Sequence, residues 1–122
     1  MTDALIIDDN RETADALQQI MELLGVTARV AYAAGPAISI LSEMTPRFVL
    51  LDIKMPGLSG IEILAFMRRE PRLAPVPVIV VTSDDQPETR KRVTQLGVSD
   101  IIIKPANLDL LEASLKKAGI LK

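Results

Sequence analysis

The stretch Phe48-Val49-Leu50-Leu51-Asp52 places one carboxylate directly after four consecutive apolar residues. A short apolar run of this kind is typical of a buried strand in a parallel sheet, which is covered on both faces. Three further runs also end in polar residues: Leu5-Ile6-Ile7 before Asp8-Asp9, Val78-Ile79-Val80-Val81 before Thr82, and Ile101-Ile102-Ile103 before Lys104-Pro105. The carboxyl ends of parallel strands meet at one edge of the sheet, where open α/β sheets bind ligands. The sequence therefore predicts that these polar side chains gather at one site.

Longer segments with apolar residues at three-to-four spacing separate these runs, and this spacing is typical of amphipathic helices. The first helix is predicted between Asn10, a suitable N-cap, and Gly25, a typical stop. Its apolar stripe comprises Ala14, Leu17, Ile20 or Met21, and Leu24. Residues 28–32 are predicted to form a further strand, and the helix after it is expected to end before Pro46.

The remaining helices have clear start or stop signals. Ser59-Gly60-Ile61-Glu62 fits a capping box, in which the serine hydroxyl and the glutamate carboxylate each bind a free backbone N–H, and Pro71 ends that helix. Pro87 and Gly97 are predicted to start and stop the fourth helix, and Asn107 to cap the last one. The apolar side of the last helix is predicted at Leu108, Leu111, Leu115 and Ala118. The alternation predicts an α/β fold, a doubly wound five-stranded parallel sheet with five helices.

The composition narrows the class of protein. A chain of 122 residues is long enough for one domain with a real core and too short for two. The net charge of −2 gives no electrostatic reason to expect nucleic-acid binding, and no apolar run is long enough to span a membrane. The chain has no Cys for thiolate chemistry and no His, the commonest general base and phosphoryl carrier. We expect a cytoplasmic domain that does not itself contact nucleic acid or membrane.

Two adjacent carboxylates, Asp8 and Asp9, follow the first apolar run. Neighbouring carboxylates repel each other unless they are solvated, protonated or neutralised by a cation. Mg²⁺ prefers oxygen ligands and suits such a pair. Taken alone, Asp8-Asp9-Asn10 would equally well turn the chain and cap a helix. Because Asp52 is expected at the end of the neighbouring strand, the metal site is the favoured interpretation.

Asp52 and Lys104 each follow an apolar run that holds no other polar residue. A carboxylate is costly to bury alone and is stabilised by a metal ion or an ammonium group. One interpretation is an Asp52–Lys104 ion pair without chemistry, with Thr82 as an ordinary cap or turn residue. If each of these residues had its own unrelated role, four strand ends would carry groups suited to the same chemistry by chance. A common site for metal-assisted phosphoryl transfer to an aspartate is therefore the preferred hypothesis.

The residue types at this edge suggest individual roles. Asp52 is the candidate nucleophile, which would attack a phosphoryl group and form an acyl phosphate. Mg²⁺ would be held by Asp9 and Asp52, and by Asp8 through water, and would offset charge on the phosphoryl oxygens. Lys104 and the Thr82 hydroxyl would each bind a phosphoryl oxygen, so that positioned charge stabilises the transition state without a histidine base.

In order and spacing, these residues resemble the motifs of the response-regulator receiver domain (CheY-like) of two-component signalling. Asp8-Asp9 resembles the acidic pair of the family, and Asp52 resembles its phosphate acceptor. Asp52-Ile53-Lys54-Met55-Pro56-Gly57-Leu58-Ser59-Gly60 resembles the loop after the acceptor. Thr82 and Lys104-Pro105 resemble the switch hydroxyl and the lysine–cis-proline pair. The resemblance covers essentially the whole chain.

The resemblance implies a flavodoxin-like sheet with strand order 2-1-3-4-5. Because only a few residues follow the last predicted helix, we expect one receiver domain over residues 1–122, with no output domain in this chain; the alternative is one domain excised from a longer chain. The resemblance also implies a signalling switch rather than an enzyme. The phosphoryl group would come from a phosphohistidine of a sensor histidine kinase or a histidine phosphotransfer protein, and the switch would act on a downstream target protein. The backbone carbonyl of Lys54 would be a further Mg²⁺ ligand.

Two positions depart from the family pattern. Ile101 stands where the family often has an aromatic switch residue, and Ala106 where it often has a Phe. An isoleucine lacks the hydroxyl and ring contacts by which an aromatic side chain couples to Thr82. The output through the fourth helix, the fifth strand and the fifth helix is therefore expected to differ. This face is also a candidate homodimer surface, although the preferred interpretation is that the flanking helices cover the isoleucines of residues 101–103.

Lys54 and Asp84 lie two positions beyond Asp52 and Thr82. By the resemblance, these positions flank the path of the water that hydrolyses the acyl phosphate. We hypothesise that Lys54 and Asp84 pair over the site and slow the entry of water.

Three other classes of protein are alternatives. A haloacid-dehalogenase-type phosphatase would need an acid where Lys54 stands, and the chain has no room for a cap domain. A flavin-binding module would need a phosphate-cradling loop where the chain has Asp8-Asp9-Asn10-Arg11-Glu12. A degenerate receiver, acting as a phosphorylation-independent interaction module, stays open because of Ile101.

Overall fold

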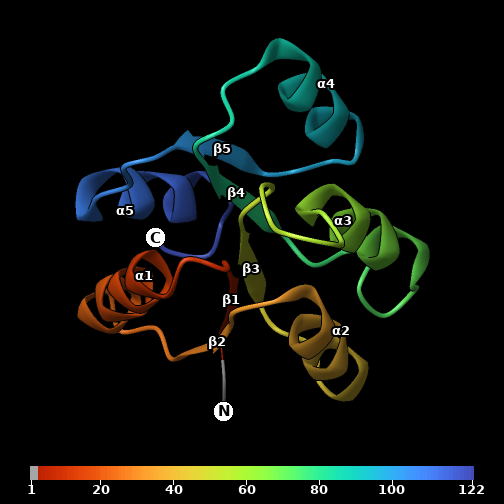
Figure 1. Ribbon diagram of the computed structural model, residues 1–122. Coiled ribbons are helices and arrows are strands. Elements are labelled where there is room, and N and C mark those ends of the chain that lie inside the picture. Colours follow the sequence, from red (N-terminus) through yellow and green to blue (C-terminus); the bar gives the residue numbers. More distant parts are fainter. Residues whose placement is uncertain (1–2) are drawn as a thin grey trace.

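The computed structural model describes residues 3–122, in which five strands alternate with five helices (Figure 1). The strands are β1 (Ala4–Ile7), β2 (Ala28–Ala31), β3 (Phe48–Leu51), β4 (Val78–Thr82) and β5 (Asp100–Ile103). The helices are α1 (Arg11–Leu23), α2 (Ala34–Glu43), α3 (Gly60–Arg69), α4 (Pro87–Gln95) and α5 (Leu108–Lys117). Each apolar run of the sequence is a strand, and each predicted helix is present.

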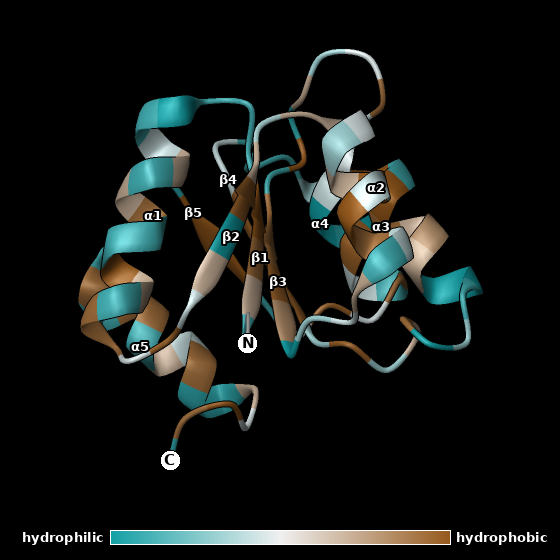
Figure 2. Cartoon of the chain, turned by 90° about the horizontal axis from the view of Figure 1, so that it is seen from below, coloured by the Kyte–Doolittle hydropathy of each residue, from teal (hydrophilic) through white to brown (hydrophobic). Residues whose placement is uncertain are grey.

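The strands form one parallel sheet in the order β2-β1-β3-β4-β5, which confirms the flavodoxin-like topology. Helices α1 and α5 cover one face of the sheet, and α2, α3 and α4 cover the other (Figure 1, Figure 2). The chain therefore leaves the neighbouring strands β1 and β3 toward opposite faces. Such a switch point opens a crevice at the carboxyl ends of the two strands.

The core has two layers, one on each face of the sheet. Strands β1, β3 and β4 are buried along their whole lengths, and alternate side chains point to opposite faces. In β1, Leu5 and Ile7 pack with residues of α2 and α3, whereas Ala4 and Ile6 pack with residues of α1 and α5. Among the described residues, no helix has both the length and the apolar character that crossing a bilayer requires.

Most of the predicted helix ends are confirmed. The side chain of Asn10 accepts a hydrogen bond from the N–H of Thr13 at 2.9 Å, and that of Asn107 accepts one from Leu110 at 2.9 Å. Gly25 follows α1 with a φ of +78°, a conformation that favours glycine. The placement of Leu108 on the packed side of α5 is wrong, because this first residue of the helix is 40% exposed.

The predicted capping box of α3 is also wrong. Ser59 is the N-cap, but its hydroxyl makes no capping hydrogen bond. The N–H of Glu62 donates instead to the carbonyl of Ser59 at 3.1 Å, and the N–H of Gly60 donates to the carbonyl of Ile53 at 3.0 Å. A Cβ at Gly60 would lie 2.1 Å from the carbonyl oxygen of Asp52. A close backbone approach therefore fixes where α3 begins.

The edge strand β5 is only partly covered. Ile102 is buried, whereas Ile101 and Ile103 are half-buried, and Val93 is the only buried residue of α4. The expectation that flanking helices cover these isoleucines is therefore confirmed for Ile102 and only in part for its two neighbours.

Replacing Gly60 tests the close approach at the start of α3. We expect Gly60→Ala to lower the free energy of unfolding by about 1–3 kcal/mol, because the new Cβ forces the backbone after Asp52 to move. Urea unfolding at constant m-value measures the change. Gly35→Ala is the matched control, since Gly35 lies in the first turn of α2 with no atom within 4 Å of an added Cβ. Gly35→Ala should raise stability by up to about 1 kcal/mol, and equal losses for both variants would contradict the argument.

Candidate functional site

The register of the sheet brings the predicted polar residues to one edge. Ile7 of β1 pairs with Leu51 of β3, so Asp8 and Asp52 leave the sheet side by side. The N–H of Asp52 donates to the carbonyl of Ile7 at 2.9 Å, which holds the two strand ends together. On the other side, the N–H of Lys104 donates to the carbonyl of Thr82 at 2.8 Å. The four strand ends therefore meet as the sequence predicts.

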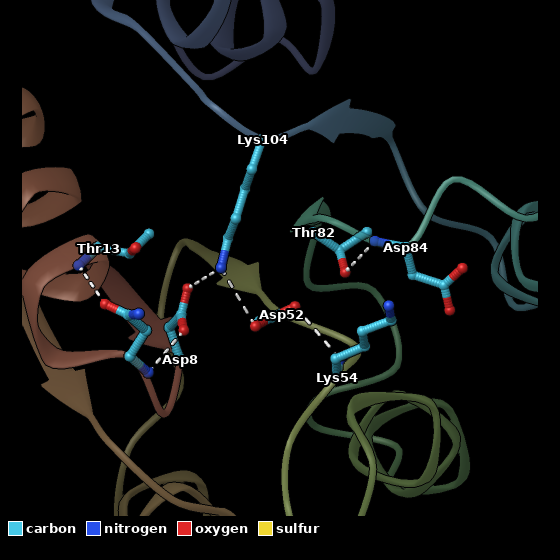
Figure 3. Close-up of polar contacts among 8 residues, drawn as sticks. Asp8, Thr13, Asp52, Lys54, Thr82, Asp84 and Lys104 are labelled. Carbon is cyan, nitrogen blue, oxygen red and sulfur yellow. Dashed lines mark hydrogen bonds and ion pairs between the residues drawn. The ribbon is translucent and has the colours of Figure 1, made fainter.

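The Lys104 ammonium lies between two carboxylates from different strands (Figure 3). Its Nζ is 2.8 Å from Oδ2 of Asp8 and 3.2 Å from Oδ2 of Asp52. Asp8 and Asp52 are only 1% and 5% exposed, so both carboxylates depend on protein groups for compensation. The Lys104–Pro105 peptide bond is cis. The ion pair that we weighed for Asp52 is thus present, and it includes Asp8 as well.

The Lys104 ammonium does not fully offset the burial of Asp8. Burial raises the pKa of Asp8, and the repulsion from Asp52 adds to it, although the hydrogen bond from Lys104 acts in the opposite direction. Burial disfavours the charged form of Lys104, but the hydrogen bonds and charges of Asp8 and Asp52 outweigh burial and raise its pKa. The ammonium therefore stays charged at neutral pH, and Asp8 remains costly to ionise.

Three carboxylates of the site are close enough to share a cation. Asp8, Asp9 and Asp52 each offer an oxygen, and these oxygens lie within 4.8 Å of one another. Asp9 is exposed, so a cation bound there would keep contact with water. Oxygen ligands together with retained water fit Mg²⁺. The fourth residue proposed for the metal, Lys54, donates its N–H to Oδ1 of Asp52 at 3.2 Å, and the role of its carbonyl stays a prediction.

The Thr82 hydroxyl is bonded within the loop that follows β4. It accepts a hydrogen bond from the N–H of Asp84 at 3.2 Å, on the side of Asp52 away from Asp8 (Figure 3). The Asp84 carboxylate accepts from the N–H of Gln86 at 3.0 Å and from the hydroxyl of Thr89 at 2.8 Å. These two hydrogen bonds lower the pKa of Asp84. Thr89 is a residue of this region that the sequence did not single out, because its contact with Asp84 spans a loop and a helix start.

The structure does not support the hypothesis that Lys54 and Asp84 form an ion pair over the site. No ion pair joins them among residues 3–122, and the Asp84 carboxylate is already bonded to the start of α4. The charge of Lys54 makes the smallest contribution to the lowered pKa of Asp84.

Behind the loop that follows β4, a small cavity of about 10 Å³ is lined by Thr82, Thr89, Val93, Ile101 and neighbouring residues. Ile101 therefore lies beside this loop, and its apolar side chain makes no polar contact with Thr82.

Comparison with known proteins identifies a single family. The family model described as the response regulator receiver domain matches residues 4–116. The probable methanogenesis regulatory protein FilR2 of Methanothrix harundinacea is 28% identical over 121 residues, covering 93% of this chain and 78% of that protein.

Solved structures show the same relationship. The signal receiver domain of a DNA-binding response regulator from Colwellia psychrerythraea has a TM-score of 0.88 and 31% identity, with 98% of each chain covered. The chemotaxis protein CheY4 of Vibrio cholerae also has a TM-score of 0.88, at 20% identity, with 96% of this chain and 98% of that chain covered. At this lower identity the likeness to CheY4 concerns the fold alone.

Removing the Lys104 charge should expose the cost of the buried carboxylates. We expect Lys104→Met, without Mg²⁺ at pH 7, to lower the free energy of unfolding by about 2–4 kcal/mol, because Asp8 and Asp52 lose their counter-charge. Lys104 has a pKa raised above its ordinary 10.5, so its ammonium stabilises the fold wherever the two carboxylates are ionised, and this stabilisation is lost as pH rises through the raised pKa. The hydrogen bond and charge of Lys104 lower the pKa of Asp8, so removing them raises that pKa further, and the stability lost by the variant grows as pH rises from about 4 toward neutrality.

Urea unfolding of wild type and Lys104→Met over that pH range measures the difference. Lys117→Met is the control, because Lys117 is 65% exposed beside Asp100, and its loss should cost no more than about 1 kcal/mol. A difference between wild type and Lys104→Met that does not change with pH would contradict the argument.

Proposed function

The chain belongs to the response regulator receiver domain family, and on that premise we propose that Asp52 is its phosphate acceptor. Receiver domains are CheY-like signalling switches of two-component systems, for which magnesium and phosphoaspartate are typical. They interact with kinases or phosphotransfer proteins and with downstream targets. The observation that carries the proposal is the Asp52 carboxylate, which is buried at the switch point, shares the Lys104 ammonium with Asp8, and lies in a cluster of three carboxylates.

In the proposed reaction, one carboxylate oxygen of Asp52 attacks the phosphorus of a phosphohistidine on a sensor histidine kinase or a histidine phosphotransfer protein. The new O–P bond forms as the N–P bond breaks, and the imidazole nitrogen keeps the electron pair of the broken bond. No proton has to be removed from Asp52 if it is ionised, so the chemistry needs no histidine base in this chain. Transfer to Asp52 is then mainly a matter of position and charge.

Lys104 and Thr82 are proposed to bind the phosphoryl oxygens. The Lys104 ammonium already contacts Oδ2 of Asp52, so it is placed to pair with an oxygen of the group that Asp52 receives. The Thr82 hydroxyl, now an acceptor for the N–H of Asp84, would rotate to donate to another oxygen. The Lys104 ammonium is in place before the phosphoryl group arrives, which is the condition under which positioned charge lowers a barrier.

Mg²⁺ is the proposed cofactor. Asp9 and Asp52 would hold it directly, Asp8 through water, and the Lys54 carbonyl would complete the protein ligands. When bound, it supplies positive charge that offsets the phosphoryl oxygens. The three clustered carboxylates support this assignment, since one ammonium leaves their charge only partly compensated.

The proposed output is a change in the protein-binding surface formed by α4, β5 and α5. A Thr82 that turned toward Asp52 would give up its contact with Asp84, and Asp84 is bonded to Thr89 at the start of α4. We propose that a downstream target protein reads this surface, and a homodimer through it stays a prediction. The receiver domain is proposed to act in the cytoplasm, as a switch rather than an enzyme.

A degenerate receiver, which binds partners without being phosphorylated, is the second candidate. Ile101 favours it, because the half-buried isoleucine offers Thr82 no polar contact. The retention of Asp8, Asp9, Asp52, Thr82 and Lys104 at one edge favours the phosphorylated switch. The two candidates differ in whether Asp52 is modified.

Phosphorylation with a small donor separates these candidates. After incubation with acetyl phosphate and Mg²⁺, intact-mass spectrometry should show a gain of one phosphoryl group on the wild type, with acetate as the leaving group. The gain should be absent from Asp52→Asn and from samples treated with a chelator. Asp109→Asn, which changes an exposed carboxylate on α5, should be labelled like the wild type. No gain on the wild type under any condition would overturn the proposal and favour the degenerate receiver.

Mg²⁺ binding is tested separately by thermal unfolding. At ten times its dissociation constant, Mg²⁺ should stabilise the wild type by about 1.4 kcal/mol, which raises the melting temperature by about 3–6 °C. Asp9→Asn should lose most of this rise without unfolding the protein, because Asp9 is exposed. Glu12→Gln changes another exposed acid, one turn further along the chain and outside the cluster, and should keep the full rise. A full rise in Asp9→Asn would show that the cation binds elsewhere.

A further inference from the structure

The outward side of α3 carries a short stripe with charge at both ends. Glu62, Ala65, Phe66 and Arg69 are spaced three, four and seven residues apart, so they lie on one side of the helix. Glu62 and Arg69 are exposed, whereas Ala65 and Phe66 are half-buried. Phe66 is one of only two Phe in the chain, and the other, Phe48, is fully buried. Along the helix, the stripe therefore presents an acidic, a small, a large aromatic and a basic side chain, in that order.

This stripe borders a groove of about 460 Å³ between α2 and α3, which lie beside each other on one face of the sheet (Figure 2). Ile38 of α2 and Leu58 of the loop before α3 add to the apolar lining, and Leu58 is 38% exposed. Glu62 and Arg69 also line the groove and bring their charges to it. The groove thus offers apolar contact with a negative and a positive charge along one helix.

Glu62 and Arg69 have no ion-pair partner within residues 3–122. Neighbouring arginines behave differently. Arg68 donates to the carbonyls of Leu96, Ala74, Val76 and Gly97 at 2.8–3.2 Å. Arg72 donates to the carbonyls of Leu41 and Met44 and to the hydroxyl of Thr45 at 2.6–2.9 Å. Within the described residues no carboxylate pairs with the Arg69 guanidinium, which is therefore available to bind another molecule.

We propose that a second copy of this chain docks on the groove through a two-fold axis that crosses α3 between Ala65 and Phe66. Glu62 and Arg69 are equally far from that point along the sequence, so antiparallel helices would place Glu62 of each copy opposite Arg69 of the other. The same symmetry places Phe66 of each copy over the small Ala65 of the other. Each phenyl ring would then enter the groove walled by Ile38 and Leu58 of the other copy. The contact is isologous, so it closes with two chains.

The distances along the helix agree with this arrangement. Seven residues of an α-helix span about 10.5 Å, so each charge pair would lie about 5 Å along the axis from the two-fold, on either side of the aromatic contact. A uniformly charged partner, such as a nucleic acid or an anionic lipid surface, would be attracted at one end of the stripe and repelled at the other. A second copy satisfies both ends. This inference does not depend on phosphorylation of Asp52.

Reversing the charges one at a time and together tests the docking. Wild type should show concentration-dependent dimerisation by sedimentation velocity, with the weak affinity expected for a small interface, in the range of about 1 µM to 1 mM. Glu62→Arg and Arg69→Glu should each weaken self-association by about tenfold or more, because each places like charges opposite one another twice. An equimolar mixture of the two single variants should associate like the wild type, since both pairs are then of opposite sign. The double variant Glu62→Arg, Arg69→Glu should also recover dimerisation.

This design separates docking from helix stability. Glu62 lies in the first turn of α3 and Arg69 in the last, so both reversals oppose the helix dipole, and the double variant should be the least stable in urea. Recovery of dimerisation in that variant cannot come from a more stable helix. Glu22→Arg, an exposed reversal on α1 across the sheet, is the matched control and should dimerise like the wild type.

A wild type that stays monomeric up to about 1 mM would overturn the proposal. Dimerisation that the single reversals leave unchanged would also overturn it, because the contact would then lie on another surface, such as that of α4, β5 and α5.

Discussion

One ammonium group lies between two buried carboxylates of different strands, and the whole carboxyl edge of the sheet is organised around it. Lys104, which follows β5, reaches Asp8 after β1 and Asp52 after β3, so a single side chain ties together the ends of three strands. The register of β1 and β3 makes this possible because it sets the two carboxylates side by side. With Asp9 nearby, however, three carboxylates exceed the charge of one lysine. The edge therefore holds an ion pair and still carries negative charge that a divalent cation would neutralise, so the ion pair and the proposed metal site fit the same place.

The part of this arrangement that could be predicted from sequence is the part set by local pattern. Apolar runs predict strands, strand ends predict where polar groups meet, and the Asn10 and Asn107 caps each need only the next three residues. The capping box at Ser59 was equally local and was wrong, because the approach of Gly60 to the Asp52 carbonyl decides how α3 begins. The carbonyl contacts of Arg68 join residues up to 29 apart and follow no sequence pattern. Hydrogen bonds from side chains to the backbone of distant segments are thus what the sequence alone could not supply.

The departure at Ile101 has a physical counterpart in the loop after β4. Thr82, Asp84 and Thr89 form a chain of hydrogen bonds from the sheet edge to the start of α4. This chain consists of hydroxyls, one N–H and one carboxylate, and it needs no aromatic residue on β5. A rotation of the Thr82 hydroxyl toward Asp52 would break its hydrogen bond with the N–H of Asp84, which would then need another acceptor. Because Val93 is the only buried residue of α4, this helix has fewer buried residues to resist a shift than any of the other four helices.

Helix α3, unlike α4, is packed firmly against the rest of the protein. Its inner side buries Ile63, Leu64 and Met67, its first residue lies against the backbone of Asp52, and Arg68 near its end binds four carbonyls. A surface on such an element needs little ordering before it binds, which lowers the entropic cost of association. The contact at its start involves the carbonyl of Asp52 and not the carboxylate, so a phosphoryl group on the side chain would not press on α3 directly. On the proposed function, α4 would respond to the state of Asp52, whereas α3 would present the same outer face in either state.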